Sequence, residues 1–346
     1  MPEHTSTNNA AANPGATSAG QRLLQALVRY GLLLILAVII VLFSVLEPAF
    51  LGVGNLFSIL QSVSIVALLA LGVTLTMAVG GLDLSIGAVA AMSLMVASYV
   101  MVVLDWGTGP AVLISLASGA LAGLFNGWLI VKMRVPDILA TLGSMFLLIG
   151  LQLIPTGGRS IAVGMILPDG EESTGSFTRL FLALGRARLW DTVPVPVLVM
   201  AVVALLIWLF LERTRFGRVL YAIGGNEQAA RLAGAPVERY KLLAYMLSAL
   251  LASLGGLLLA ARLGRGDVSS GNGLVLDALG AALIGFAVLG ARKPNAFGTL
   301  IGALLVATLL NGLTMLNAPY YAQDFVKGLV LVLALMFTFG LAHRAR

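Results

Sequence analysis

The sequence predicts an all-α membrane protein, a polytopic transmembrane helical bundle of about ten spans. Of its 346 residues, 59% are hydrophobic and 10% are charged, and the mean hydropathy is +1.01. Apolar runs of about 20 residues, the length that crosses a bilayer as a helix, recur along the whole chain. A soluble domain carries about 25% charged residues, so this composition excludes one.

The apolar runs divide the chain into a short tail and one membrane domain. Residues 1–21 are small and polar, which predicts a disordered cytosolic tail, and residues 22–346 form the membrane domain. The start lacks the pattern of a cleaved signal peptide, so the first span is expected to be retained. The predicted spans are 23–46, 56–79, 84–104, 111–131, 138–154, 195–211, 242–261, 274–289, 297–316 and 325–341.

The basic residues predict the orientation of these spans. Excess Lys and Arg in short loops marks the cytoplasmic side. Only Arg262 and Arg265 fall in a short outer loop, and the long loop 157–192 has nearly balanced charge. Both termini are therefore expected in the cytoplasm. The basic residues assigned to the inner side are Arg22, Arg29, Lys132, Arg134, Arg213, Arg215, Arg218, Arg231, Arg239, Lys241, Arg292, Lys293, Arg344 and Arg346.

Residues 212–240 form the longest charged, helix-competent segment between apolar runs. Within it, 226–234 is typical of a short helix. Asn226 can cap its N-terminus, Glu227 suits the positive end of the helix dipole, and Gly234 can end it. A short helix held between two spans can act as a lever for a soluble partner. The alternative is an ordinary solvated connector.

Ionisable residues inside predicted spans are candidates for function, because charge at the bilayer centre is costly. Asp83 follows two glycines that can interrupt a helix, and either it or Ser85 can cap the next helix. Asp277 stands near the start of the eighth span, where it either complements the helix dipole or faces the pathway. Asp324 and Lys327, three residues apart, are expected to pair.

Neutral polar residues also fall within the predicted spans, and they suit either a sugar-like solute or hydrogen bonds between helices. Gly119, Gly123 and Gly127 share one helix face, which favours close helix packing. The polar residues are Asn126, Thr141, Ser144, Gln152, Asn311 and Thr314, and the aromatic residues that can form an apolar wall beside them are Phe125, Trp128 and Phe146.

The sequence predicts no catalytic or metal site. It contains no cysteine, and its two histidines, His4 and His343, stand in the tails. None of its lysines follows a glycine, as the phosphate-binding loop of a nucleotide site requires. The basic residues are spread over short loops, which does not suggest nucleic acid binding. If ATP drives this protein, a different polypeptide binds it.

Several motifs, in the same order along the chain, resemble the ribose-type permeases of bacterial ATP-binding cassette (ABC) importers. GLDLSIG at 81–87 is similar to one signature of that family, and RFGR with YAIGGNE and ARLAG within 215–234 to its cytoplasmic loop. LDAL at 276–279 and VKG at 326–328 are similar to later elements. The resemblance covers roughly residues 48–341.

The resemblance implies a permease subunit in the bacterial inner membrane, surrounded by lipid. It implies a second permease copy or paralogue, separate ATPase subunits that bind ATP and Mg, and a periplasmic binding protein that delivers a small solute. It makes 226–234 the coupling helix, with Asn226, Glu227, Ala230, Arg231 and Gly234 as its residues. The candidates for the translocation pathway are Gly81, Asp83, Ser85, Asn126, Phe146, Asp277 and Asn311.

Other functions stay open at this point. A stand-alone channel for small polyols, a branched-chain amino acid permease and a membrane-embedded enzyme or sensor are the alternatives. The segment 284–295 departs from the glycine-rich run of many ribose-type members. The solute is therefore left open among pentoses, hexoses, sugar-derived signals and other polyol-like molecules.

Overall fold

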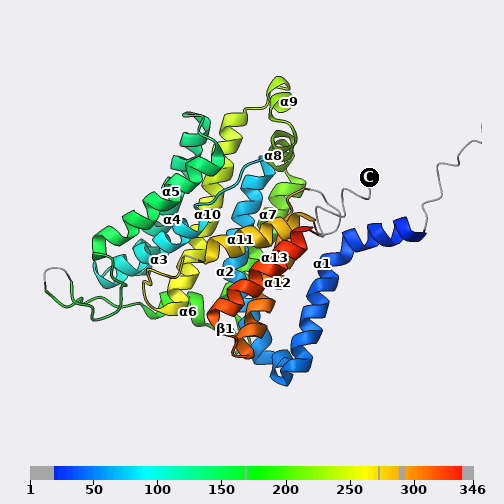
Figure 1. The fold of residues 1–346 in the computed structure, drawn as a ribbon. Coiled ribbons are helices and arrows are strands. Elements are labelled where there is room, and N and C mark those ends of the chain that lie inside the picture. The colour runs from blue at the N-terminus through cyan, green and yellow to red at the C-terminus, as the bar shows by residue number, and fades with distance from the viewer. Residues whose placement is uncertain (1–18, 168–169, 272, 288–292, 337–346) are drawn as a thin grey trace, which may run out of the picture.

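The computed structural model describes residues 19–167, 170–271, 273–287 and 293–336 (Figure 1). Within these ranges the chain is mainly helical, with turns, an irregular segment at 157–178, isolated β-bridges and one two-stranded hairpin, which confirms the all-α class. Six helices are long and apolar enough to cross a membrane, and three shorter apolar helices accompany them. The total of about ten spans stays a prediction.

The long helices lie close to the predicted spans, and the largest shifts are at the starts of α10, at Val237 instead of residue 242, and of the last helix. That helix begins at Tyr320 instead of residue 325, directly after Pro319. The helices are α1 (Ala19–Leu46), α2 (Val53–Ala78), α3 (Ile86–Val102), α4 (Thr108–Val131), α5 (Asp137–Leu153), α6 (Arg179–Arg186), α7 (Val195–Arg213), α8 (Arg215–Gly225), α9 (Glu227–Leu232), α10 (Val237–Leu263), α11 (Leu274–Ala287), α12 (Ala296–Met315) and α13 (Tyr320–Leu335), with single 3-10 turns at Pro48–Leu51 and Ile154–Thr156.

The core lies where α2, α3 and α10 meet. Every residue from 63 to 76 in α2 is buried, and α3 is buried over nearly its whole length. A helix that is apolar on all sides belongs in the interior of a bundle. α5, α7 and α13 instead present large apolar side chains outward, among them Phe146, Leu206 and Phe325. α1 lies at the edge of the bundle (Figure 1), where its Leu36, Ile39 and Phe43 are buried in the main core cluster.

Small residues let α4 approach α10 closely, as their spacing predicts. A Cβ atom added to Gly123 would lie 2.6 Å from the carbonyl oxygen of Tyr245 and 2.7 Å from the Cβ of Ala249. Added Cβ atoms on Gly119 and Gly127 would crowd Ser253 and Leu242 in the same way. The three glycines therefore line one continuous contact between the two helices.

The prediction that 157–192 is a polar loop is wrong in part, because the segment contains α6 and the first strand of a hairpin. The hairpin pairs β1 (Arg188–Leu189) with β2 (Val193–Pro194). Arg186, the last residue of α6, donates hydrogen bonds to the carbonyl oxygens of Arg262 and Leu263 at the end of α10 (2.9 and 2.8 Å). The charges of the segment masked the apolar residues, including buried Phe181, that fold it onto the bundle.

The bundle has two distinct ends. α8 and α9 project from one end, and α6 with the hairpin covers the other (Figure 1). We call them the α9 end and the α6 end. Basic residues gather at the α9 end, where Arg134 lines a cleft with α9 and Lys293 pairs with Glu212 (2.9 Å). That this end faces the cytoplasm stays a prediction. Residues outside the described ranges include 1–18 of the predicted tail, His4, Arg292, His343, Arg344 and Arg346.

Replacing Gly123 with leucine should destabilise the protein, because α4 must move away from the backbone of α10. Overpacking of a tight interior costs about 1–3 kcal/mol. Gly109 is a matched control on the same helix, since an added Cβ there meets nothing within 4 Å. Thermal unfolding in detergent should show a lower midpoint for Gly123→Leu and little change for Gly109→Leu. Equal midpoints would show that the close helix contact does not matter.

Candidate functional site

The charged segment between α7 and α10 is packed against the bundle. The Thr214 hydroxyl caps α8 by accepting a hydrogen bond from the Gly217 amide (3.1 Å). Leu220 and Ile223 of α8 are buried in one cluster with Leu75 at the end of α2. The segment is therefore a fixed part of the α9 end, which disfavours the solvated-connector interpretation.

The predicted short helix is confirmed as α9. The Asn226 side-chain oxygen accepts a hydrogen bond from the Ala229 amide (2.9 Å), as expected of an N-cap. Gly234 follows the helix with a φ of +84°, a left-handed conformation that glycine adopts without strain. Ala230 is buried against the cluster that contains Val237. These local signals fix where α9 begins, where it ends and which face it buries.

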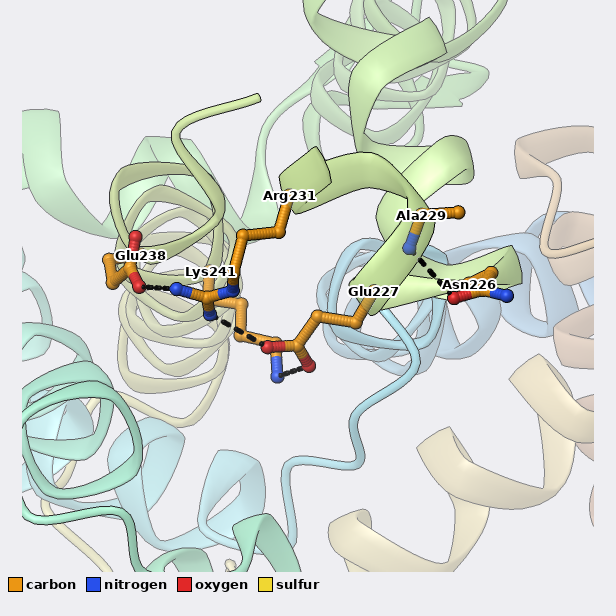
Figure 2. Close-up of polar contacts among 6 residues, drawn as sticks. All are labelled: Asn226, Glu227, Ala229, Arg231, Glu238 and Lys241. Carbon is orange, nitrogen blue, oxygen red and sulfur yellow. Dashed lines mark hydrogen bonds and ion pairs between the residues drawn. The ribbon is translucent and has the colours of Figure 1, made fainter. Parts of the chain in front are cut away.

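Ion pairs join α9 to the first turns of α10. Glu227 accepts from Lys241 at 2.7 Å and from Arg231 at 3.2 Å, and Arg231 also pairs with Glu238. Figure 2 shows the four charged side chains converging between the two helices, with the Asn226 cap on the other side of α9. A displacement of α9 must therefore carry the start of α10 with it or break these contacts.

The charge of Glu227 depends on this arrangement. The hydrogen bond from Lys241 is the main cause that lowers the pKa of Glu227 below its ordinary value, and Arg231 contributes in the same direction. A carboxyl whose pKa is lower in the folded state stabilises that state above its ordinary pKa. The pairs are therefore intact at neutral pH and are lost as the pH falls through the lowered pKa.

One face of α9 is exposed and unusually apolar. Leu232 is 90% exposed, the largest value among the large apolar side chains of the described residues. Gln228 and Ala229 are exposed beside it. The sequence predicted Ala230 and Arg231 as residues of the coupling helix, but Ala230 faces inward and Leu232 was missed. Leu232 lies two residues beyond the buried Ala230, and a helix turns by about 200° over two residues. This spacing alone indicates that Leu232 faces away from the surface that buries Ala230.

A polar cleft lies beside α9. It has a volume of about 510 Å³, and α9, the start of α10 and the turn between α4 and α5 form its walls. Its charged lining residues are Arg134, Asp137, Glu227, Arg231, Glu238 and Lys241.

The second site is the interruption between α2 and α3, at residues 80–85, which we call the break. Gly80 has a φ of +80°, as the predicted interruption of the helix requires. The Gly81 amide bonds to Thr76 (2.9 Å), and the Leu84 amide donates to the Thr141 hydroxyl of α5 (3.2 Å). A broken helix is tolerated at membrane depth where its polar groups find partners in the protein.

Asp83 is the centre of the break and is fully buried. One carboxylate oxygen accepts from the amide and the hydroxyl of Ser85 (3.0 and 2.6 Å), and the other accepts from the Ser248 hydroxyl of α10 (3.0 Å). Ser85 in turn accepts from the Asn126 amide of α4 (2.8 Å). The side chain of Ser85 makes no capping bond to α3. The carboxylate thus joins α10 to α3 through its two oxygens, and Ser85 adds α4.

The comparisons with known proteins agree with these features. The family described as "Branched-chain amino acid transport system / permease component" matches residues 55–335. The ribose import permease protein RbsC of Escherichia coli strain K12 is 39% identical over 304 residues, which cover 88% of this chain and 91% of that protein. RbsC of Bacillus subtilis strain 168 is 35% identical, over 87% of this chain and 89% of that protein.

The chain belongs to this permease family. A third relative, the xylose transport system permease protein XylH of Haemophilus influenzae, is 34% identical over 88% of this chain and 94% of its own length. The resemblance carried by the GLDLSIG motif and by residues 215–234 is confirmed. The permease is a multi-pass membrane protein and a transport component, not an enzyme. No solved structure matches it.

The predicted pathway residues of the permease fall into separate places. Gly81, Asp83, Ser85 and Asn126 meet at the break. Phe146 lies on the outward face of α5 and is 64% exposed. Asn311 exchanges two hydrogen bonds of 3.0 Å with Asn55, which joins α12 to α2, and Asp277 lies on α11. That they line the translocation pathway stays a prediction.

Asp277 has a partner that the sequence did not predict. Lys327 of α13 donates to it at 2.8 Å and lies farther, at 3.6 Å, from the predicted partner Asp324. The Asp277 and Lys327 side chains are 10% and 20% exposed, while that of Asp324 is 73% exposed. The spacing of three residues along one helix predicted the pair of Asp324 with Lys327, which is the longer contact. Such spacing does not show which residue of another helix lies opposite. The buried pair fixes α13 against α11.

Replacing Lys327 with methionine should destabilise the permease, because Asp277 then stays buried without a counter-charge. Breaking one partner of a buried pair costs about 3–5 kcal/mol. Asp324→Asn is the matched control and should change stability by less than about 1 kcal/mol, as for an exposed pair. The double variant Asp277→Asn with Lys327→Met should recover part of the loss. Thermal unfolding in detergent measures all three, and equal effects of Lys327→Met and Asp324→Asn would contradict the assignment.

Proposed function

We propose that this chain is the permease subunit of an ABC importer that carries a sugar or sugar-like solute across the bacterial inner membrane. The observation that carries the proposal is α9, a capped helix tied to α10 by ion pairs and exposing Leu232 at its tip. Such a helix suits contact with a soluble motor protein. The names of the ribose and xylose permeases support the class of solute.

In this proposal, cytosolic ATPase subunits dock on the exposed face of α9. Leu232 supplies the apolar anchor, and Gln228 and Ala229 lie beside it. Anchors of this kind carry much of the binding energy of an interface. The partner ATPase binds ATP and Mg, and its closure moves α9 together with the start of α10.

A periplasmic binding protein docks at the α6 end in the same proposal. Two segments at that end, 157–192 and 262–273, are joined by an isolated antiparallel β-bridge between Ile161 and Gly266. The Ile161 amide donates to the Gly266 carbonyl (2.7 Å), and the Gly266 amide donates to the Ile161 carbonyl (2.8 Å). A force applied to one loop therefore reaches the other loop and the end of α10.

The solute crosses between this chain and a second permease copy or paralogue. The outward face of α5 is apolar and exposed, with Leu139 at 60% and Phe146 at 64%, and suits either lipid or that second chain. A cavity of about 460 Å³ among α3, α4 and α5 is lined by Tyr99, Trp106 and mostly apolar residues. A polar solute gains few hydrogen bonds there, so it passes without tight binding.

Uptake into vesicles tests the function. The permease is reconstituted with the proposed ATPase and binding protein, and ATP-dependent uptake of labelled ribose, xylose, glucose, galactose and leucine is measured. Uptake of a sugar that needs all three proteins is the expected result. Leucine uptake alone would assign the chain to amino acid transport. Sugar movement by the permease without ATPase would indicate a channel instead.

Replacing Leu232 with serine should weaken binding of the ATPase by at least about tenfold, because an exposed apolar anchor is lost. Leu180→Ser is the matched control, since Leu180 is 68% exposed on α6 at the opposite end. Co-purification at graded ATPase concentrations gives both affinities. Unchanged affinity in Leu232→Ser would remove α9 as the docking site.

A further inference from the structure

Two separate routes lead from α8 and α9 to the break. The first is a backbone contact between Gly224 of α8 and the end of α2. A Cβ atom added to Gly224 would lie 2.4 Å from the carbonyl oxygen of Ala78 and 3.1 Å from the amide nitrogen of Gly80. Contacts between main chains leave no side chain to absorb a shift, so α8 and the start of the break move together.

The second route follows one face of α10. Lys241, Tyr245 and Ser248 are spaced four and three residues apart, which places them on the same side of the helix. Lys241 binds Glu227 of α9 (2.7 Å), and Ser248 binds Asp83 in the break (3.0 Å). Between them, Tyr245 packs against Gly81, where an added Cβ would overlap its hydroxyl. One rigid helix face thus touches α9 at one point and the break at two.

The break also contacts α4 and α5. Ser85 bonds to Asn126 of α4 (2.8 Å), and the Leu84 amide bonds to Thr141 of α5 (3.2 Å). Tyr245 also donates to Asp137 at the start of α5 (3.2 Å). α5 carries the exposed Phe146 and is one of the walls of the cavity described above. The break therefore lies between the α8–α9 segment and the helices beside the proposed pathway.

The polar groups of the break are suited to transmitting force. Asp83, Ser85, Asn126, Thr141 and Ser248 are all fully buried. Hydrogen bonds in such a dry setting are strong, and breaking one leaves a costly unpaired group. Asn126 Oδ1 has no partner among the described residues, so it is free to accept a bond in a second arrangement of the same groups.

We propose that Gly80, Gly81, Asp83 and Ser85 are positioning residues that transmit the displacement of α8 and α9 to α4 and α5 during transport. The proposal rests on the proposed function, in which a partner ATPase moves α9. Gly80, in its left-handed conformation, is the hinge, because the helical hydrogen-bond ladder stops there. Asp83 connects α10 to the start of α3, because one of its oxygens accepts from Ser248 and the other accepts from Ser85, the residue before α3.

Gly224→Ala tests the backbone route, with Gly225→Ala as the matched control. An added Cβ at Gly225 meets nothing within 4 Å. Each variant is reconstituted with the ATPase and the binding protein, and uptake of the best-transported sugar of the panel is divided by ATP hydrolysed. Gly224→Ala is expected to lower this ratio by about tenfold, the effect of about 1.4 kcal/mol on a rate. Gly225→Ala should keep it.

Ser248→Ala tests the α10 route with almost no change in volume. Its control is Ser64→Ala, because the buried hydroxyl of Ser64 bonds to Leu60 within its own helix. Ser248→Ala should also lower uptake per ATP while the ATPase still binds. This second pair keeps the proposal testable if Gly224→Ala does not fold.

Two outcomes would overturn the proposal. In the first, Gly224→Ala and Ser248→Ala give the same uptake per ATP hydrolysed as their controls, Gly225→Ala and Ser64→Ala. In the second, uptake, ATP hydrolysis and assembly fall in parallel, which is the result of a packing defect alone. Failure of the proposed function looks different, because the unaltered permease would then carry leucine alone or move sugar without the ATPase, whatever the Gly224 variant does.

Discussion

Buried hydrogen bonds at the break are the constraint on which the rest of the structure depends. The helical ladder of α2 ends before Gly80, and freed backbone groups at membrane depth need partners within the protein. Thr141 of α5 accepts from the Leu84 amide. Ser248 of α10 and Asn126 of α4 bond to the side chains of the break. Those helices must hold their places for the break to exist, so α4, α5 and α10 are fixed around it.

The α9 end is built on a different principle. Ala230 is buried in an apolar cluster with Val237, and ion pairs between partly exposed side chains add directional contacts that are individually weak. Together they orient α9 on α10 and leave Leu232 exposed. In the proposed function, the buried break is the stiff part and α9 is the exposed part on which the ATPase acts.

The two ends of the molecule are linked mainly by α10. It begins at the ion pairs of α9, packs along the glycine face of α4, and ends under the Arg186 side chain of α6. The displacements proposed to start at the binding protein and at the ATPase therefore both reach α10. Its central position explains why its small residues, such as Ala249 and Ala252, are fully buried.

The sequence alone determined the class, the approximate helix bounds, the capped α9 and the glycine contact of α4, because hydropathy, capping and small-residue spacing are local signals. Tertiary structure decided which partners meet across the bundle. Lys327 pairs best with Asp277 instead of nearby Asp324, Asp83 finds Ser248 far along the chain, and α6 folds onto α10. Spacing along the chain shows which residues share a helix face, but the packing of helices decides what that face meets.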